Sequence, residues 1–200
     1  MSSELEIEPR KLFGPWNEGY ALDKHKIHSR IVGYNQFNHP EFETIRTQIG
    51  ESLFRYKYRN DVIQLDPLTD TAIQFITTKW KNEIDLIIPV PPSNSTRIYQ
   101  PSIEIAKNIS LKLKLPCDLN SIFKNKTTEE LKNISEKEEK LSIIKDAYEI
   151  RESKDLENKN ILLFDDLYQT GATAETIANI LFHDCKVKSV KFLCITKTGN

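Results

Sequence analysis

One stretch of the chain, NILLFDDLYQTGATAETI at residues 160–177, constrains the fold more than any other. An apolar run leads directly into the adjacent carboxylates of Asp165 and Asp166, and a turn of small residues then precedes a helical pattern. A continuous apolar run bounded by turn residues is typical of a strand buried on both faces of a parallel sheet. Two neighbouring carboxylates at the end of such a strand repel each other unless a positive or hydrogen-bonding group lies between them. The stretch therefore predicts a strand, a turn and a helix, with a ligand site at the turn.

The rest of the chain repeats this alternation of strand and helix patterns. Apolar residues spaced by three and four positions predict a helix that begins at Phe42 and continues through Tyr56, and a second that follows the LDPLTD stretch at 65–70. Further expected elements are helices at 103–113 and 174–182 and strands at 84–90, 146–150 and 187–196. Strands that alternate with helices form βαβ units. The predicted fold class is therefore α/β, a Rossmann-like, doubly wound, mostly parallel sheet flanked by helices.

Composition excludes several classes of protein. The 200 residues carry a formal net charge of −1, which gives no general attraction to nucleic acid or to an anionic membrane. No apolar segment approaches the ~20 residues that a membrane helix needs, and the charged first residues lack the apolar core of a secretion signal. Cys117, Cys185 and Cys194 are far apart without C-x-x-C spacing, which predicts buried thiols rather than disulfides or a zinc site. A cytoplasmic protein without membrane contact is expected.

The turn after Asp166 has the composition of a phosphate site. Parallel strands bind ligands at their carboxyl ends, where loops meet helix N-termini. Gly171 lets the backbone approach closely, the hydroxyls of Thr170 and Thr173 can donate hydrogen bonds, and amides at a helix N-terminus favour a phosphate. The carboxylates of Asp165 and Asp166 can accept hydrogen bonds from vicinal hydroxyls or hold a divalent cation through water. Together these groups predict a ribose 5-phosphate site, whereas each alone would be an ordinary strand end or helix cap.

The segment ILLFDDLYQTGAT, residues 161–173, is similar to the phosphoribosyl-pyrophosphate (PRPP) motif of type I phosphoribosyltransferases. The resemblance implies the type I phosphoribosyltransferase fold with a small N-terminal hood. It implies that Asp165 and Asp166 are catalytic residues that hold the ribose and, indirectly through water or the PRPP hydroxyls, Mg²⁺. The 5-phosphate would be bound by Gln169, Thr170, Gly171, Ala172 and Thr173. Gln169 stands where the family commonly has Thr or Ser, and its amide can still donate a hydrogen bond to phosphate.

The segment IDLIIPVPPSNSTR, residues 84–97, occupies the place of the family's pyrophosphate loop. It resembles the PVP…R segment of the competence-protein-F-like (ComF-like) branch. The resemblance assigns the pyrophosphate loop to Pro92, Ser93, Asn94 and Ser95. Arg97 would be a catalytic cation, because its planar guanidinium matches pyrophosphate oxygens; the alternative is a proline-rich turn with a solvated arginine. The branch's usual RGFNQ is replaced by RIYQPS, which leaves Gln100 as a candidate remnant.

Two further segments resemble parts of the ComF-like branch. Residues 124–150 stand where the branch has a charged lid followed by a strand, so Lys126 or Lys132 could reach the pyrophosphate on closure. A solvent-facing role is the commoner one for any single lysine of such a charge run. LFRYKYRND at residues 53–61 resembles the branch's LKYRGD element, so Lys57 and Arg59 would either meet an anionic substrate or lie at a solvated helix end.

The N-terminal part of the chain lacks the four-cysteine zinc module that often opens ComF-like proteins. Its first 40 residues show no clean period and predict short strands and turns. We expect residues 1–60 to form the hood, an appendage rather than an independent domain, and residues 61–200 to form the phosphoribosyltransferase core. The hood would recognise the group that accepts ribose. His25, His28 and His39 are spaced unlike zinc ligands and are expected to pack or to lie on the surface.

The resemblance implies an enzyme, a phosphoribosyltransferase that binds PRPP with Mg²⁺ and transfers the 5-phosphoribosyl group to a nitrogen acceptor with release of pyrophosphate. The sequence does not identify the acceptor, and a homodimer is expected by resemblance only. Two alternatives remain open: a non-catalytic regulatory protein that binds PRPP or a nucleotide, and a competence-related protein that handles single-stranded DNA. The near-neutral charge argues against nucleic acid as a partner, because a nucleic-acid groove needs a basic stripe.

Overall fold

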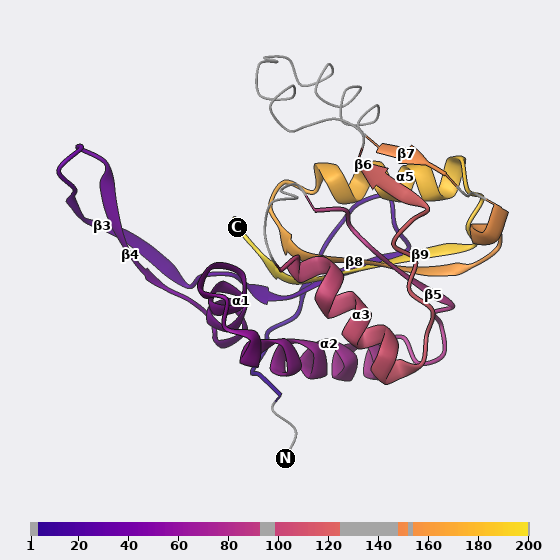
Figure 1. Cartoon of the computed structure of the whole chain (residues 1–200), viewed down its shortest axis with the longest axis horizontal. Coiled ribbons are helices and arrows are strands. Elements are labelled where there is room, and N and C mark those ends of the chain that lie inside the picture. Colours follow the sequence, from indigo (N-terminus) through magenta and orange to yellow (C-terminus); the bar gives the residue numbers. More distant parts are fainter. Residues whose placement is uncertain (1–3, 93–98, 125–147, 152–153, 200) are drawn as a thin grey trace.

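The computed structural model of the chain describes residues 4–92, 99–124, 148–151 and 154–199 (Figure 1). In this part of the chain the centre is a five-stranded sheet with the strand order β1-β2-β9-β8-β5. β1 pairs antiparallel with β2, and the other neighbouring strands of this sheet pair in parallel. The strands are β1 (Arg10–Lys11), β2 (Glu18–Lys24), β5 (Leu86–Pro89), β8 (Asn160–Tyr168) and β9 (Ser189–Lys197).

Helices cover both faces of the sheet, which confirms the predicted α/β, mostly parallel, doubly wound fold (Figure 1). One face carries α1 (Gln48–Arg59), α2 (Leu65–Lys79) and α3 (Pro101–Leu113), and the opposite face carries α5 (Ala172–His183). Two 3-10 turns lie at Val62–Gln64 and Lys154–Leu156. Among the residues that the structure describes, no helix combines the length and apolar character needed to cross a bilayer.

The apolar run of β8 is explained by this layered arrangement. Ile161 and Leu163 contribute to the core beneath α5, and Leu162 and Phe164 contribute to the core beneath α2 and α3. All four side chains are fully buried. Successive side chains of a strand point to opposite faces, so a strand covered on both sides must be apolar at every position.

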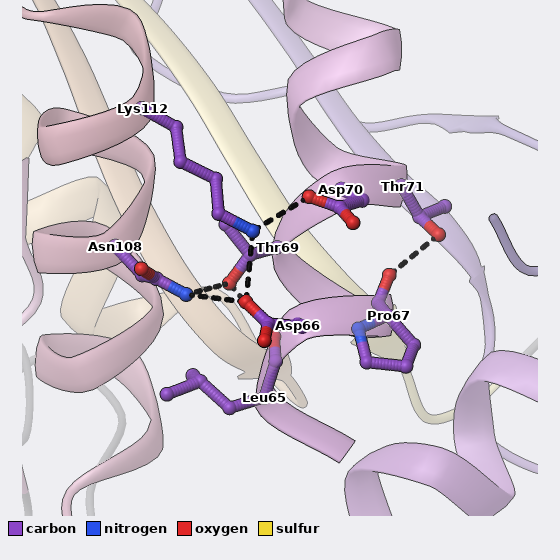
Figure 2. Close-up of polar contacts among 8 residues, drawn as sticks. All are labelled: Leu65, Asp66, Pro67, Thr69, Asp70, Thr71, Asn108 and Lys112. Carbon is purple, nitrogen blue, oxygen red and sulfur yellow. Dashed lines mark hydrogen bonds and ion pairs between the residues drawn. The ribbon is translucent and has the colours of Figure 1, made fainter. Parts of the chain in front are cut away.

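A polar cluster ties α2 to α3 on the surface of their shared face (Figure 2). The Nζ of Lys112 donates to Oδ1 of Asp66 and to Oδ1 of Asp70, both at 2.8 Å. Nδ2 of Asn108 donates to Asp66 at 3.3 Å and to the hydroxyl of Thr69 at 3.2 Å. The hydrogen bonds from Lys112 and Asn108 lower the pKa of Asp66. These contacts join two helices that pack on the same face of the sheet.

The helix predicted to begin at Phe42 is wrong in its first part. Residues 40–45 form β4 (Pro40–Ile45), which pairs antiparallel with β3 (His28–Tyr34) as a hairpin. Phe42 lies opposite Ile31 in this pairing, a cross-strand contact that a helix could not make. The helix α1 begins only after Thr47, whose Oγ1 accepts a hydrogen bond from the Gly50 amide at 3.1 Å.

This hairpin, which we call the arm (residues 28–45), projects away from the central sheet (Figure 1). Ile31, Tyr34 and Phe42 are all more than half exposed on it. An ion pair between Arg30 and Glu43 joins its two strands. The helical spacing of Phe42 with later apolar residues therefore does not reflect a shared buried face.

Residues 1–60 include the strands β1 and β2 of the central sheet. Within them, β2 pairs in parallel with β9 inside the central sheet, and the arm and α1 follow. The division into a hood of residues 1–60 and a core of residues 61–200 stays a prediction. The predicted strand near residues 146–150 is present as β7 (Tyr148–Ile150), which pairs antiparallel with β6 (Ile122–Lys124).

Candidate functional site

A cavity of about 420 Å³ lies where β5 and β8 end. The pairing of β5 with β8 stops at Pro89 and Phe164, whereas β8 continues beside β9 as far as Tyr168. The chain leaves β5 toward α3 on one face and leaves β8 toward α5 on the other. Loops that diverge to opposite faces leave a crevice at the carboxyl ends of the strands, the place where α/β sheets bind ligands.

The loop predicted to bind the 5-phosphate forms one wall of this cavity. Its five predicted residues all line the cavity, namely Gln169, Thr170, Gly171, Ala172 and Thr173. Gly171 is the residue before α5 and has φ 83°, the left-handed region that favours glycine. A Cβ on Gly171 would lie 2.3 Å from the hydroxyl of Tyr168 and 2.9 Å from Oε1 of Glu175. A side chain at this position would strain the backbone and displace Tyr168 and Glu175, and the first-turn amides of α5 lie at the wall of the cavity.

Asp165 and Asp166 both line the cavity, within β8 rather than beyond its end. Asp165 Oδ1 accepts a hydrogen bond from the amide of Asp166 at 2.8 Å. Burial of the Asp165 carboxyl raises its pKa well above the ordinary value, and the adjacent charge of Asp166 raises it further. The carboxyl end of β8 thus holds two acids close together. This arrangement costs folding free energy, which a bound ligand could offset.

Lys57 is the cation that lies against this acidic pair. Its Nζ donates to Oδ2 of Asp166 at 2.5 Å, and both side chains are buried, with 11% and 12% of their surface exposed. Sequence reasoning left Lys57 and Arg59 equally open to a substrate or a solvated role. The structure separates them: Lys57 lines the cavity, whereas the Arg59 guanidinium lies 5.8 Å from the ring centroid of Phe54.

Tyr148 and Lys124 also line the cavity, and neither was predicted to. They are cross-strand partners in the β6–β7 pair. The Tyr148 hydroxyl is hydrogen-bonded to the side chain of Thr173, and burial raises the pKa of Tyr148 while it lowers the pKa of Lys124. The strand at Tyr148 could be predicted from the sequence, but its contact with a loop 25 positions later could not, since it depends on the tertiary fold.

Part of the predicted pyrophosphate loop can be placed. Pro92 lines the cavity together with Gln100, and Val90 just before them donates its amide to the Phe164 carbonyl at 2.7 Å. The other predicted positions lie outside the described residues: Ser93, Asn94, Ser95, Arg97, Lys126 and Lys132.

The histidines of the N-terminal part differ in their surroundings. His25 is half-buried near Lys57 and Asp166, and its Nδ1 is 3.1 Å from the hydroxyl of Thr196. Burial lowers the pKa of His25 to about 4, and the neighbouring positive charges act in the same direction. His28 and His39 are exposed on the arm.

Neither a protein-family model nor a curated protein sequence matches the chain. Solved structures do match it. Adenine phosphoribosyltransferase from Saccharomyces cerevisiae, in complex with an imino-altritol bisphosphate and adenine, is 14% identical with a TM-score of 0.50, over 86% of this chain and 83% of that one. Another adenine phosphoribosyltransferase structure is 12% identical with a TM-score of 0.50, over 86% of this chain and 84% of that one.

The chain has the phosphoribosyltransferase fold. UMP synthase from Leishmania donovani is a further match, 13% identical with a TM-score of 0.41, over 84% of this chain. This chain spans 28% of the length of that UMP synthase.

The phosphoribosyltransferase fold raises the question of how Mg²⁺ would be held. Among the described residues, no three His, Cys, Asp or Glu side chains are grouped so as to bind a metal ion. Two carboxylates, Asp165 and Asp166, line the cavity, and Lys57 already contacts one of them. Because Mg²⁺ usually keeps several waters and takes one or two carboxylates plus substrate phosphates, these residues fit an ion that arrives with a phosphorylated ligand.

Proposed function

We propose that the chain is a phosphoribosyltransferase that binds PRPP with Mg²⁺ and transfers its 5-phosphoribosyl group to a nitrogen acceptor. The observation that carries the proposal is the cavity at the end of β8. Its lining includes a loop whose conformation favours glycine at Gly171, the N-terminus of α5, and the two acids Asp165 and Asp166. Amides and hydroxyls for a phosphate, in the same cavity as carboxylates for hydroxyls, suit a ribose 5-phosphate.

In this proposal the protein works by positioning and electrostatics. The loop from Gln169 to Thr173 would bind the 5-phosphate, and Asp165 and Asp166 would accept hydrogen bonds from the ribose hydroxyls. Binding energy from these two contacts would orient C1, where the acceptor nitrogen attacks as the bond to pyrophosphate breaks. Mg²⁺, when bound, would neutralise pyrophosphate charge. Arg97 is proposed as the protein's own cation for the leaving group.

The acceptor would enter past Lys57 and Tyr58 of α1, which line the cavity together with Pro91, Pro92 and Gln100. These groups support a planar acceptor that packs against the tyrosine ring and the prolines. The arm residues do not line the cavity, so the part of the 1–60 segment that would meet the acceptor is α1. Membership of the ComF-like branch and a cytoplasmic homodimer are retained as predictions.

A second candidate is a regulatory protein that binds PRPP without turnover. Gln169 in place of the family's Thr or Ser favours it, as does Lys57 already paired with Asp166. Calorimetry with PRPP and Mg²⁺, followed by pyrophosphate-release assays over purine, pyrimidine and amine acceptors, distinguishes the candidates. The enzyme requires binding and release with at least one acceptor, and the regulator requires binding alone. Absence of PRPP binding contradicts both.

Asp166→Asn provides the residue-level test of this function. The amide keeps the shape of the side chain but removes the charge that would hold the ribose hydroxyls, so PRPP affinity or turnover should fall by about tenfold or more, as expected for a charged hydrogen bond worth ~1.5–3 kcal/mol. Asp70→Asn is the matched control, because Asp70 is also paired with a lysine but lies on α2 outside the cavity. Equal PRPP binding by wild type and Asp166→Asn would contradict the role assigned to Asp166.

A further inference from the structure

The contact between Lys57 and Asp166 is unusual among the ion pairs of the described chain because both partners are buried at a cavity wall. The two residues are 109 positions apart and come from α1 and β8. The Lys57 Nζ also lies 6.0 Å from the ring centroid of Tyr58, which lines the same cavity. Burial of two charges costs solvation free energy, so the presence of this ion pair is weak evidence that it stabilises the fold.

The surroundings of the pair explain what the lysine does. Asp165 lies directly beside Asp166 and accepts its backbone amide, so two carboxyl groups share one small region of the cavity. His25 lies near them, but its pKa of about 4 leaves it neutral at physiological pH. Lys57 is in hydrogen-bond contact with Asp166, and it takes one of the two oxygen-bearing groups that a divalent ion would use.

We propose that Lys57 is a built-in counter-ion that occupies the cation position beside Asp166, so that the ligand-free cavity does not take up a free divalent cation. The ion would then enter only with the oxygens of a phosphorylated sugar. This inference rests on the proposed function in taking the cavity as the site of a sugar phosphate and its metal.

Distance and charge both support this exclusion. An ammonium nitrogen 2.5 Å from Oδ2 of Asp166 competes for that oxygen with an ion that would bind it at about 2.0–2.1 Å. A dication that approached Asp165 instead would meet the positive charge of Lys57, which also acts on the Asp165 carboxyl. Like charges repel more strongly in a partly buried site than in water.

The test uses Mn²⁺ alone, titrated into the full-length chain without PRPP and followed by electron paramagnetic resonance of the free ion. Wild type should show no saturable site in the range where Lys57→Met shows one. Lys57→Met should bind Mn²⁺ about tenfold or more tightly than wild type, because the competing charge is gone. The double variant Lys57→Met/Asp166→Asn should lose this gain. Arg59→Met is the matched control: it removes a cation from the same helix that lies on Phe54, and it should bind Mn²⁺ as wild type does.

Two results would overturn the inference. One is a saturable Mn²⁺ site in the wild-type chain that matches the affinity of Lys57→Met, and the other is a folded Lys57→Met that gains no Mn²⁺ binding. If circular dichroism shows that Lys57→Met does not fold, Lys57→Gln replaces it, because glutamine removes the charge but keeps a polar side chain. Lys57→Arg keeps the charge and should bind Mn²⁺ no better than wild type. PRPP calorimetry on the wild type is independent: failure there contradicts the proposed function and leaves the Mn²⁺ results to decide the role of Lys57.

Discussion

At the scale of single residues, the cavity depends on an unusual backbone conformation at Gly171 and an unusual pKa at Asp165. Gly171 holds a left-handed conformation that a residue with a Cβ rarely adopts, and Asp165 has a raised pKa because it is withdrawn from water beside another acid. The buried acid reduces the stability of the empty protein, and both residues leave groups ready for a ligand. Strained or costly positions of this kind are concentrated at functional sites.

Gly171→Ala tests the loop. The new methyl group would clash with the Tyr168 hydroxyl. The alanine would also have to adopt a left-handed backbone conformation, which costs ~1–2 kcal/mol for a residue with a Cβ. We expect a lower melting temperature and a loss of PRPP binding by calorimetry. Gly199→Ala is the matched control, because Gly199 has φ 81° but nothing within 4 Å of its Cβ position. Loss of PRPP binding in both variants, or in neither, would contradict the role of the loop.

Asp165→Asn tests the raised pKa through stability. As pH rises above ~3.9, the ordinary pKa of Asp, the unfolded chain ionises at Asp165 before the folded chain does. The unfolded state is thereby favoured, so the wild type loses stability that the asparagine variant keeps. The variant should therefore melt at a higher temperature near neutral pH, by about 2–4 °C for each kcal/mol gained, and this advantage should shrink toward pH 4. An advantage that is constant with pH, or that grows on acidification, would contradict the direction of the pKa shift.

At the scale of elements, the patterns predicted most of the helices and strands but not how the chain leaves one and enters another. The helices α2, α3 and α5 follow the expected apolar spacing, because each packs one face on the sheet. The spacing that begins at Phe42 fails, because the residues before Thr47 belong to the exposed arm and pair across strands instead. Thr47, through its cap on Gly50, marks the true start of α1.

Phe42→Ser tests this division between arm and helix. Phe42 is 59% exposed and pairs with Ile31 across the arm, a contact worth about 0.2–1 kcal/mol, so the melting temperature should fall by no more than a few degrees. Leu53→Ala is the buried counterpart on α1 and should cost ~2–5 kcal/mol of unfolding free energy. Thermal unfolding followed by circular dichroism compares the two. Similar losses in both variants would show that Phe42 is buried and that the arm does not project in solution.

At the scale of the whole molecule, the sheet order explains how distant parts of the sequence form one site. The acids and the phosphate loop could be predicted because they follow one another in a single strand-turn-helix unit, which periodicity and turn chemistry describe locally. Lys57, Lys124 and Tyr148 could not be assigned to the cavity on local grounds, since they reach it from α1 and the β6–β7 pair. Their place depends on which faces the connecting helices take, a property of the topology.

The most direct test of the account is a crystal structure of the chain with PRPP and Mg²⁺ bound. We predict that the 5-phosphate lies within hydrogen-bonding distance of the backbone amides of Gly171, Ala172 and Thr173, with the ribose hydroxyls at Asp165 and Asp166. Density for PRPP at another place, or an empty cavity at saturating PRPP, would contradict it.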